Sequence, residues 1–187
     1  MTKLLTVLAA LLLATAARAT ELQVNILGIA STNTNASLRP FEASFAFDSS
    51  QALWTGACSA EYQTSPITLT NVNVLLNGHA AFNAPSVTAD LNHTGPCPGV
   101  FFLGLDFQSA GNSFYWSTDP PAAPNGADPI ADAFLGLQTP GNGAWMTSTE
   151  QLNLAFDKIS VISVPEPGTL VLLALGLAAV GLRGYRR

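Results

Sequence analysis

The chain has 187 residues, of which 48% are hydrophobic and only 10% are charged, and its formal net charge is −5. Residues 20–163 hold eleven acidic side chains against two basic ones, a balance of −9. Because a nucleic-acid-binding surface needs a basic patch that meets phosphates, this composition excludes nucleic-acid binding and disfavours attachment to an anionic membrane surface.

The first 19 residues have the pattern of a secretion signal. An apolar run over residues 4–13 follows a basic start, and Ala17 and Ala19 supply the two small residues that signal cleavage requires. The run is too short, and its exit too polar, for an N-terminal anchor helix. We therefore predict a signal peptide over residues 1–19 and a mature chain that begins at Thr20.

Residues 20–163 form one predicted domain in which apolar and polar residues alternate. Such strands bury one face and leave the other wet, which is typical of antiparallel sheets. The alternation changes phase near Thr70-Asn71, where it predicts a β-bulge, and it changes phase again near Asp157-Lys158. We predict an all-β fold of about eight short strands, closed as an antiparallel β-sandwich, with a barrel as the alternative. The predicted strands contain Leu22–Ile26, Phe41–Phe47, Ile67–Leu76, His79–Phe82, Val87–Leu91, Phe101–Phe107, Phe114–Ser117 and Leu152–Val161.

Two local signals add detail to this pattern. Asn77-Gly78 predicts a tight hairpin turn, since both residues accept positive φ. Residues 119–129 carry four prolines and predict a loop. Asp128 followed by Pro129 is typical of a helix N-cap and first turn, so we expect one short helix that ends near Leu135 before Gly136.

The chain has two cysteines, Cys58 and Cys97. In an exported chain an even count favours a disulfide, here closing a loop of 39 residues. The alternatives are free thiols or a metal site that also uses His79 and His93. The spacing of these four residues is irregular and matches no zinc pattern, so we expect no metal.

Catalytic motifs are absent from the sequence. No G-x-S-x-G elbow and no glycine-rich phosphate loop occurs. A Ser-His-Asp triad would have to use His79 or His93, which we predict to be solvated loop residues. Many acids could form a glycosidase pair, but nothing singles out two of them. We therefore expect neither a catalytic residue nor a cofactor.

Adjacent aromatic residues, Tyr115 and Trp116, raise the possibility of a sugar contact. Neighbours on a strand point to opposite faces, so one of the two side chains should be exposed. An exposed ring can stack on the C–H face of a sugar, whereas an aromatic side chain on a sandwich more often packs in the core.

The C-terminus combines an extended segment, an apolar run and a basic end. Pro165 and Pro167, on either side of Glu166, are prolines and cannot lie inside a helix. Residues 169–182 follow as an apolar run of 14 residues. At about 1.5 Å per residue that run is about 21 Å long as a helix, short for a bilayer core of about 30 Å. The basic stop, which should stay cytoplasmic, is Arg183, Arg186 and Arg187.

This tail resembles the PEP-CTERM sorting signal of Gram-negative bacteria in the order of its elements. The resemblance covers residues 164–187 only and implies recognition of Pro165, Glu166 and Pro167 by an exosortase, a membrane-embedded transpeptidase. It also implies export across the inner membrane, transient anchoring by the apolar helix, and delivery to the cell surface or exopolysaccharide matrix. It transfers no activity to the rest of the chain.

Three hypotheses for the body follow. The first is a non-enzymatic protein of the cell surface or exopolysaccharide matrix. The second is a carbohydrate-binding module, which an exposed aromatic platform near Trp116 would favour. The third is a secreted glycoside hydrolase, which needs two carboxyl groups facing each other in a cleft.

Overall fold

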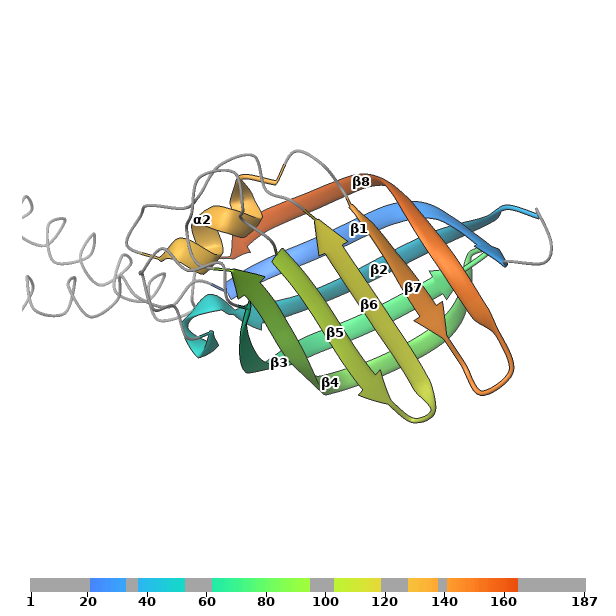
Figure 1. Ribbon diagram of the computed structural model, residues 1–187, viewed down its shortest axis with the longest axis horizontal. Coiled ribbons are helices and arrows are strands. Elements are labelled where there is room, and N and C mark those ends of the chain that lie inside the picture. The colour runs from blue at the N-terminus through green and yellow to red at the C-terminus, as the bar shows by residue number, and fades with distance from the viewer. Residues whose placement is uncertain are drawn as a thin grey trace, which may run out of the picture.

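The body of the protein is a closed barrel of eight antiparallel strands in the order β1 to β8 (Figure 1). The computed structural model describes residues 21–32, 37–52, 62–94, 103–118, 128–137 and 141–164. The strands are β1 (Glu21–Thr32), β2 (Arg39–Asp48), β3 (Tyr62–Leu76), β4 (His79–Thr94), β5 (Leu103–Ser109), β6 (Asn112–Thr118), β7 (Asn142–Met146) and β8 (Gln151–Val164). A 3-10 turn, η1 (Ser49–Gln51), follows β2, and a short helix, α2 (Pro129–Leu135), precedes β7.

The all-β prediction and its strand number are confirmed, but the predicted sandwich is wrong. The first and last strands pair along their length, from Glu21 opposite Val164 to Thr32 opposite Leu152. This pairing closes the sheet, so every strand has two neighbours and none is an edge. Alternation could not reveal the closure, because a sandwich and a barrel both bury one face of each strand.

The strands are also longer than predicted. The segments expected as two strands around His79–Phe82 and Val87–Leu91 form the single strand β4, and β7 was not predicted at all. β7 is short, and its glycine and alanine give little alternation. The long strands can curve around the barrel because bulges interrupt their ladders, and bulges increase local twist.

The bulge predicted near Thr70-Asn71 is confirmed, and the phase change near Asp157-Lys158 corresponds to a second bulge in the structure. The β2–β3 register shifts between Ser44 and Ala46, opposite the segment that contains Asn71, whose φ is 53°. The β1–β8 register shifts between Leu27 and Gly28, where Asp157 is the extra residue of β8. At Gly28 a Cβ atom would lie 2.3 Å from the carbonyl oxygen of Ala155, so only glycine fits without a shift.

The predicted hairpin turn at Asn77-Gly78 is confirmed, with φ values of 54° and 75°. Ala110-Gly111 makes an equivalent turn between β5 and β6, with φ values of 50° and 75°. The predicted helix is confirmed as well. The side chain of Asp128 accepts a hydrogen bond from the backbone N–H of Ala131 at 3.0 Å, and Gly136 caps the C-terminus of α2.

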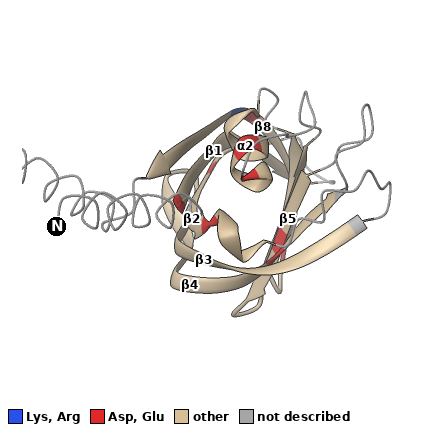
Figure 2. Cartoon of the chain, turned by 90° about the vertical axis from the view of Figure 1, so that its left-hand side faces the viewer, with Lys and Arg blue, Asp and Glu red and all other residues tan. Residues whose placement is uncertain are grey.

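α2 lies across one end of the barrel (Figure 2). Its inward face buries four residues. Phe134 packs edge-on against Phe47 at a ring-centroid distance of 5.0 Å and in a tilted arrangement against Trp116 at 5.8 Å. The hydroxyl of Ser49, on η1, donates a hydrogen bond to the N-cap carboxylate of Asp128. The helix and the 3-10 turn therefore close this end of the interior together.

Candidate functional site

Side chains fill the middle of the barrel. Phe41 on β2 and Phe114 on β6 come from walls four strands apart, yet their rings stack with centroids 6.3 Å apart. Phe107 lies 5.5 Å from Phe114, and Trp145 lies 6.4 Å from Phe107. A barrel of eight strands is just wide enough for side chains to fill. The described part of the barrel therefore has a packed core where these rings meet.

Trp116 belongs to this core, so of the two residues considered for a sugar contact it is the one that packs inside. Its side chain is 0% exposed and points inward from β6, where it packs against Phe134. Tyr115 is 40% exposed and lies on the outer face of the same strand. The prediction that one of these two neighbouring side chains is exposed is therefore confirmed, and the exposed one is Tyr115.

A row of hydrogen-bonded polar side chains runs across the outer face beside Tyr115. The hydroxyl of Thr64 on β3 donates to the amide oxygen of Asn92 on β4 at 2.7 Å. The amide nitrogen of Asn92 donates in turn to a carboxylate oxygen of Asp106 on β5 at 2.6 Å. Asp106 is directly opposite Tyr115 in the β5–β6 register, so the row ends at the exposed ring. We call Thr64, Asn92, Asp106 and Tyr115 the outer strip.

The electrostatics of the outer strip are acidic. Asp90 is directly opposite Asp106 in the β4–β5 register. Partial burial raises the pKa of Asp106, the hydrogen bond from Asn92 lowers it, and the charge of Asp90 raises it, for a net upward shift. The basic residues of the described chain are Arg39 on β2 and Lys158 on β8, so β3–β7 supply no cation to offset these carboxylates.

Sequence reasoning missed Thr64, Asn92 and Asp106. The Ala110-Gly111 turn could have identified Asp106, because a two-residue hairpin at this position places Asp106 opposite Tyr115. The hydrogen bonds from β3 and β4 depend on registers set by bulges and were not predictable from local sequence.

The two histidines do not form a shared site. His79 is exposed at the start of β4, whereas His93 is 0% exposed near its end and faces inward. The prediction that His93 is a solvated loop residue is therefore wrong. At about 3.3 Å per residue, the 14 steps between them place these side chains roughly 46 Å apart along the strand. One metal ion cannot use both.

Two of the hollows on the described surface are each lined by two acids. One, of about 210 Å³, includes Glu42 and Asp157 beside Leu27 and Pro40. The other, of about 180 Å³, includes Glu21 and Asp48. Neither includes a residue of the outer strip. Among the described residues no group of three or more His, Cys, Asp or Glu could hold a metal ion.

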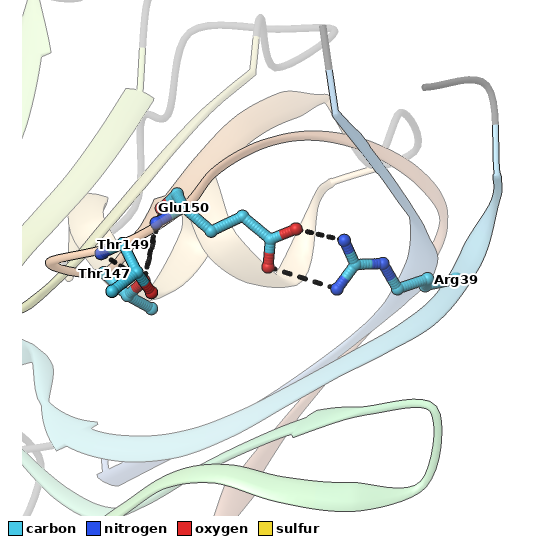
Figure 3. Close-up of polar contacts among 4 residues, drawn as sticks. All are labelled: Arg39, Thr147, Thr149 and Glu150. Atoms are coloured by element: carbon cyan, nitrogen blue, oxygen red, sulfur yellow. Dashed lines mark hydrogen bonds and ion pairs between the residues drawn. The ribbon is translucent and has the colours of Figure 1, made fainter. Parts of the chain in front are cut away.

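An ion pair lies at the barrel end opposite α2 (Figure 3). The Arg39 guanidinium at the start of β2 donates two hydrogen bonds to the Glu150 carboxylate just before β8, one of them at 3.1 Å. The Thr147 hydroxyl accepts from the backbone N–H of Glu150 at 3.0 Å, which fixes the turn that carries it. The hydrogen bonds from Arg39 lower the pKa of the Glu150 carboxyl group.

Several predicted sites lie outside the described residues. They are the signal cleavage site Ala17, Ala19 and Thr20, the cysteines Cys58 and Cys97, the motif Pro165, Glu166 and Pro167, the basic stop Arg183, Arg186 and Arg187, and the membrane helix over residues 169–182. No helix within the described residues is long and apolar enough to cross a membrane.

The described barrel does show where the two terminal segments leave it. Glu21, the first residue of β1, pairs with Val164, the last residue of β8. The chain therefore enters β1 and leaves β8 at neighbouring positions, at the barrel end that carries α2 (Figure 1).

The comparison with protein families matches residues 163–187 to the PEP-CTERM protein-sorting motif. Neither the comparison with curated proteins nor that with solved structures finds a match. The motif implies an exported protein that an exosortase directs to the cell surface or extracellular space. The chain therefore carries a PEP-CTERM protein-sorting motif over residues 163–187.

Proposed function

We propose that this protein is a non-enzymatic component of the cell surface or exopolysaccharide matrix, displayed as a rigid barrel that is held by one end. The observation that carries this proposal is the pairing of Glu21 with Val164 beside the sorting motif. A protein whose two termini leave from one end can be anchored there without blocking the opposite end or the outer face.

The packed interior supports a structural role over an enzymatic one. Catalysis of hydrolysis by two carboxyl groups needs a cleft that holds the substrate between them. Asp106, whose pKa is raised, lies on the convex outer face rather than in either hollow. The glycoside hydrolase hypothesis therefore has less support than a structural or binding role.

The proposed route is export, transient anchoring in the inner membrane and release by an exosortase. Its test is replacement of Pro165, Glu166 and Pro167 with alanine. We expect the variant to be exported but to remain as full-length protein in the inner membrane, because the processing enzyme no longer recognises it. Fractionation of the native host and mass spectrometry of the C-terminus measure this outcome.

A matched control replaces three residues of β8 that are exposed and lie before the motif, namely Asp157, Lys158 and Ser160, with alanine. This control should be processed and reach the surface like the native protein. If the variant without the three motif residues reaches the surface with the native C-terminus, the motif does not direct sorting and the proposal fails.

A second candidate function is carbohydrate binding by the body. The exposure of Tyr115 on the outer face favours it, because an exposed ring on a rigid strand can contact a sugar without rearrangement.

A further inference from the structure

The outer strip offers an exposed aromatic ring on a rigid sheet. Tyr115 lies between Asp106 on β5 and Ala144 on β7 in the strand registers. The methyl group of Ala144 is small, so it leaves much of the ring uncovered, and the side chain stays 40% exposed. A ring held this way loses little conformational freedom when a flat apolar surface stacks on it.

Hydrogen-bonding groups beside the ring are already oriented. The bonds from Thr64 to Asn92 and from Asn92 to Asp106 fix the side-chain amide across three strands. They use one of the two amide hydrogens of Asn92 and one of the two carboxylate oxygens of Asp106. The remaining oxygen of Asp106, opposite the ring, provides an acceptor for ligand hydroxyls, and the remaining hydrogen of Asn92, one strand farther away, provides a donor.

The charge of the strip restricts the ligand. Asp90 and Asp106 are opposite each other, and the described residues of β3–β7 include no lysine or arginine. An acidic polymer would bring further negative charge to uncompensated carboxylates, which is unfavourable. A ligand rich in hydroxyl groups and without acidic groups satisfies the ring, the donor and the acceptor together.

We propose that the outer strip of Thr64, Asn92, Asp106 and Tyr115 binds a non-acidic polysaccharide, with a sugar ring stacked on Tyr115 and its hydroxyls bonded to Asn92 and Asp106. This inference rests on the proposed function only in its choice of a matrix polymer as ligand. The sorting motif itself indicates neither this site nor its class of ligand.

The test uses the protein purified from the native host, from whichever cell fraction contains it. Matrix polysaccharide from that host is separated by anion exchange into acidic and non-acidic fractions, and binding to each is measured by affinity electrophoresis. We expect retardation by the non-acidic fraction only. Tyr115→Ala should weaken this binding about ten-fold, since loss of one stacked ring corresponds to about 1.4 kcal/mol.

The matched control is Met146→Ala on the neighbouring strand β7, where the side chain is 36% exposed on the same outer face. It should bind like the native protein, whereas Asp106→Asn should weaken binding without loss of the fold measured by circular dichroism. Binding to neither fraction, binding to the acidic fraction alone, or an equal loss in Met146→Ala would overturn the inference.

This experiment separates the inference from the proposed function. If Tyr115→Ala is processed and reaches the surface normally but the native protein binds no polysaccharide, the strip is not a binding site and the sorting proposal stands. If the native protein is absent from the surface and matrix, the proposed function fails whatever the binding result.

Discussion

At the scale of single residues, the barrel end opposite α2 depends on one ion pair. Arg39 is on β2 and Glu150 is in the turn before β8, and β1 lies between β2 and β8. Both side chains are partly exposed, with 25% and 35% of their surfaces accessible, so water and salt weaken the attraction between them. The pair joins the start of β2 to the β7–β8 turn and contributes little to global stability.

The pair predicts a pH dependence with a definite sign. Arg39 lowers the pKa of Glu150 below its ordinary value of 4.5, so the contribution to stability is present above that value. It is lost as the pH falls through the lowered pKa of the folded protein. Glu150→Gln should therefore lower the unfolding temperature slightly at pH 7 and leave it unchanged in strong acid. Thermal melts of both proteins from pH 7 to pH 2 measure the difference, and a difference that grows in acid contradicts this account.

At the scale of elements, α2 has the clearest role. Phe134 is 0% exposed and joins the helix to the strands through Phe47 and Trp116. A short helix of this length is not stable alone, so its packing against the barrel maintains it. In this arrangement Phe47, Trp116 and Phe134 are all buried.

Phe134→Ala should lower the free energy of unfolding by about 3–5 kcal/mol, the usual cost of removing a buried aromatic side chain. Leu135, the next residue, is 47% exposed and provides the control. Leu135→Ala should change the free energy of unfolding by no more than about 0.5 kcal/mol. Urea denaturation followed by tryptophan fluorescence compares the two variants, and similar costs for both would show that α2 does not seal the barrel.

The strand registers also bear on the predicted disulfide. Tyr62 and Thr94 are partners in the β3–β4 ladder. Cys58 is four positions before Tyr62, and Cys97 is three positions after Thr94. At about 3.3–3.6 Å per residue, both segments are long enough to reach the Cα separation of about 4.4–6.8 Å that a disulfide needs.

We predict that Cys58 and Cys97 are bridged in the exported protein. Maleimide added under denaturing conditions should label neither cysteine before reduction and both after it. Reduction should also lower stability, by roughly 4 kcal/mol if the cross-link acts mainly by restricting the unfolded chain. Labelling of both cysteines without reductant would show that they are free thiols.

At the scale of the whole molecule, the barrel has two different ends. The α2 end holds the attachment points of both terminal segments, and the opposite end holds the β7–β8 turn (Figure 1). A protein attached through its C-terminal segment should therefore place the β7–β8 turn farther from the attachment surface than α2. The outer strip lies on the side wall and crosses four neighbouring strands, from β3 to β6.

This orientation predicts a difference in access on intact cells. Ser148→Cys in the β7–β8 turn and Leu135→Cys on α2 both introduce a thiol at an exposed position. A maleimide carrying a large polyethylene glycol chain should label Ser148→Cys faster, because the other position lies close to the attachment surface. The native protein measures background labelling, and purified variants measure intrinsic reactivity. Equal rates on cells after this correction would contradict the orientation.

The sequence by itself determined the sorting motif and most strand positions. The motif is a linear signal of adjacent residues, so it can be identified without knowledge of the fold, and residues 163–187 match the sorting family directly. Alternation predicted inward positions such as Phe41 and Phe107, because successive side chains on any strand point to opposite faces. The bulge near Asn71 and the cap at Asp128 were equally local and equally predictable.

Only the tertiary structure decided how the sheet closes and where a ligand could bind. Closure depends on the pairing of β1 with β8, which are separated by more than a hundred residues, and alternation is the same with or without it. The inward position of Trp116 and the outward position of Tyr115 depend on which face of β6 the closed barrel buries. The outer strip needs side chains from four strands in register, and that alignment arises from bulges and long-range pairing rather than from any local sequence signal.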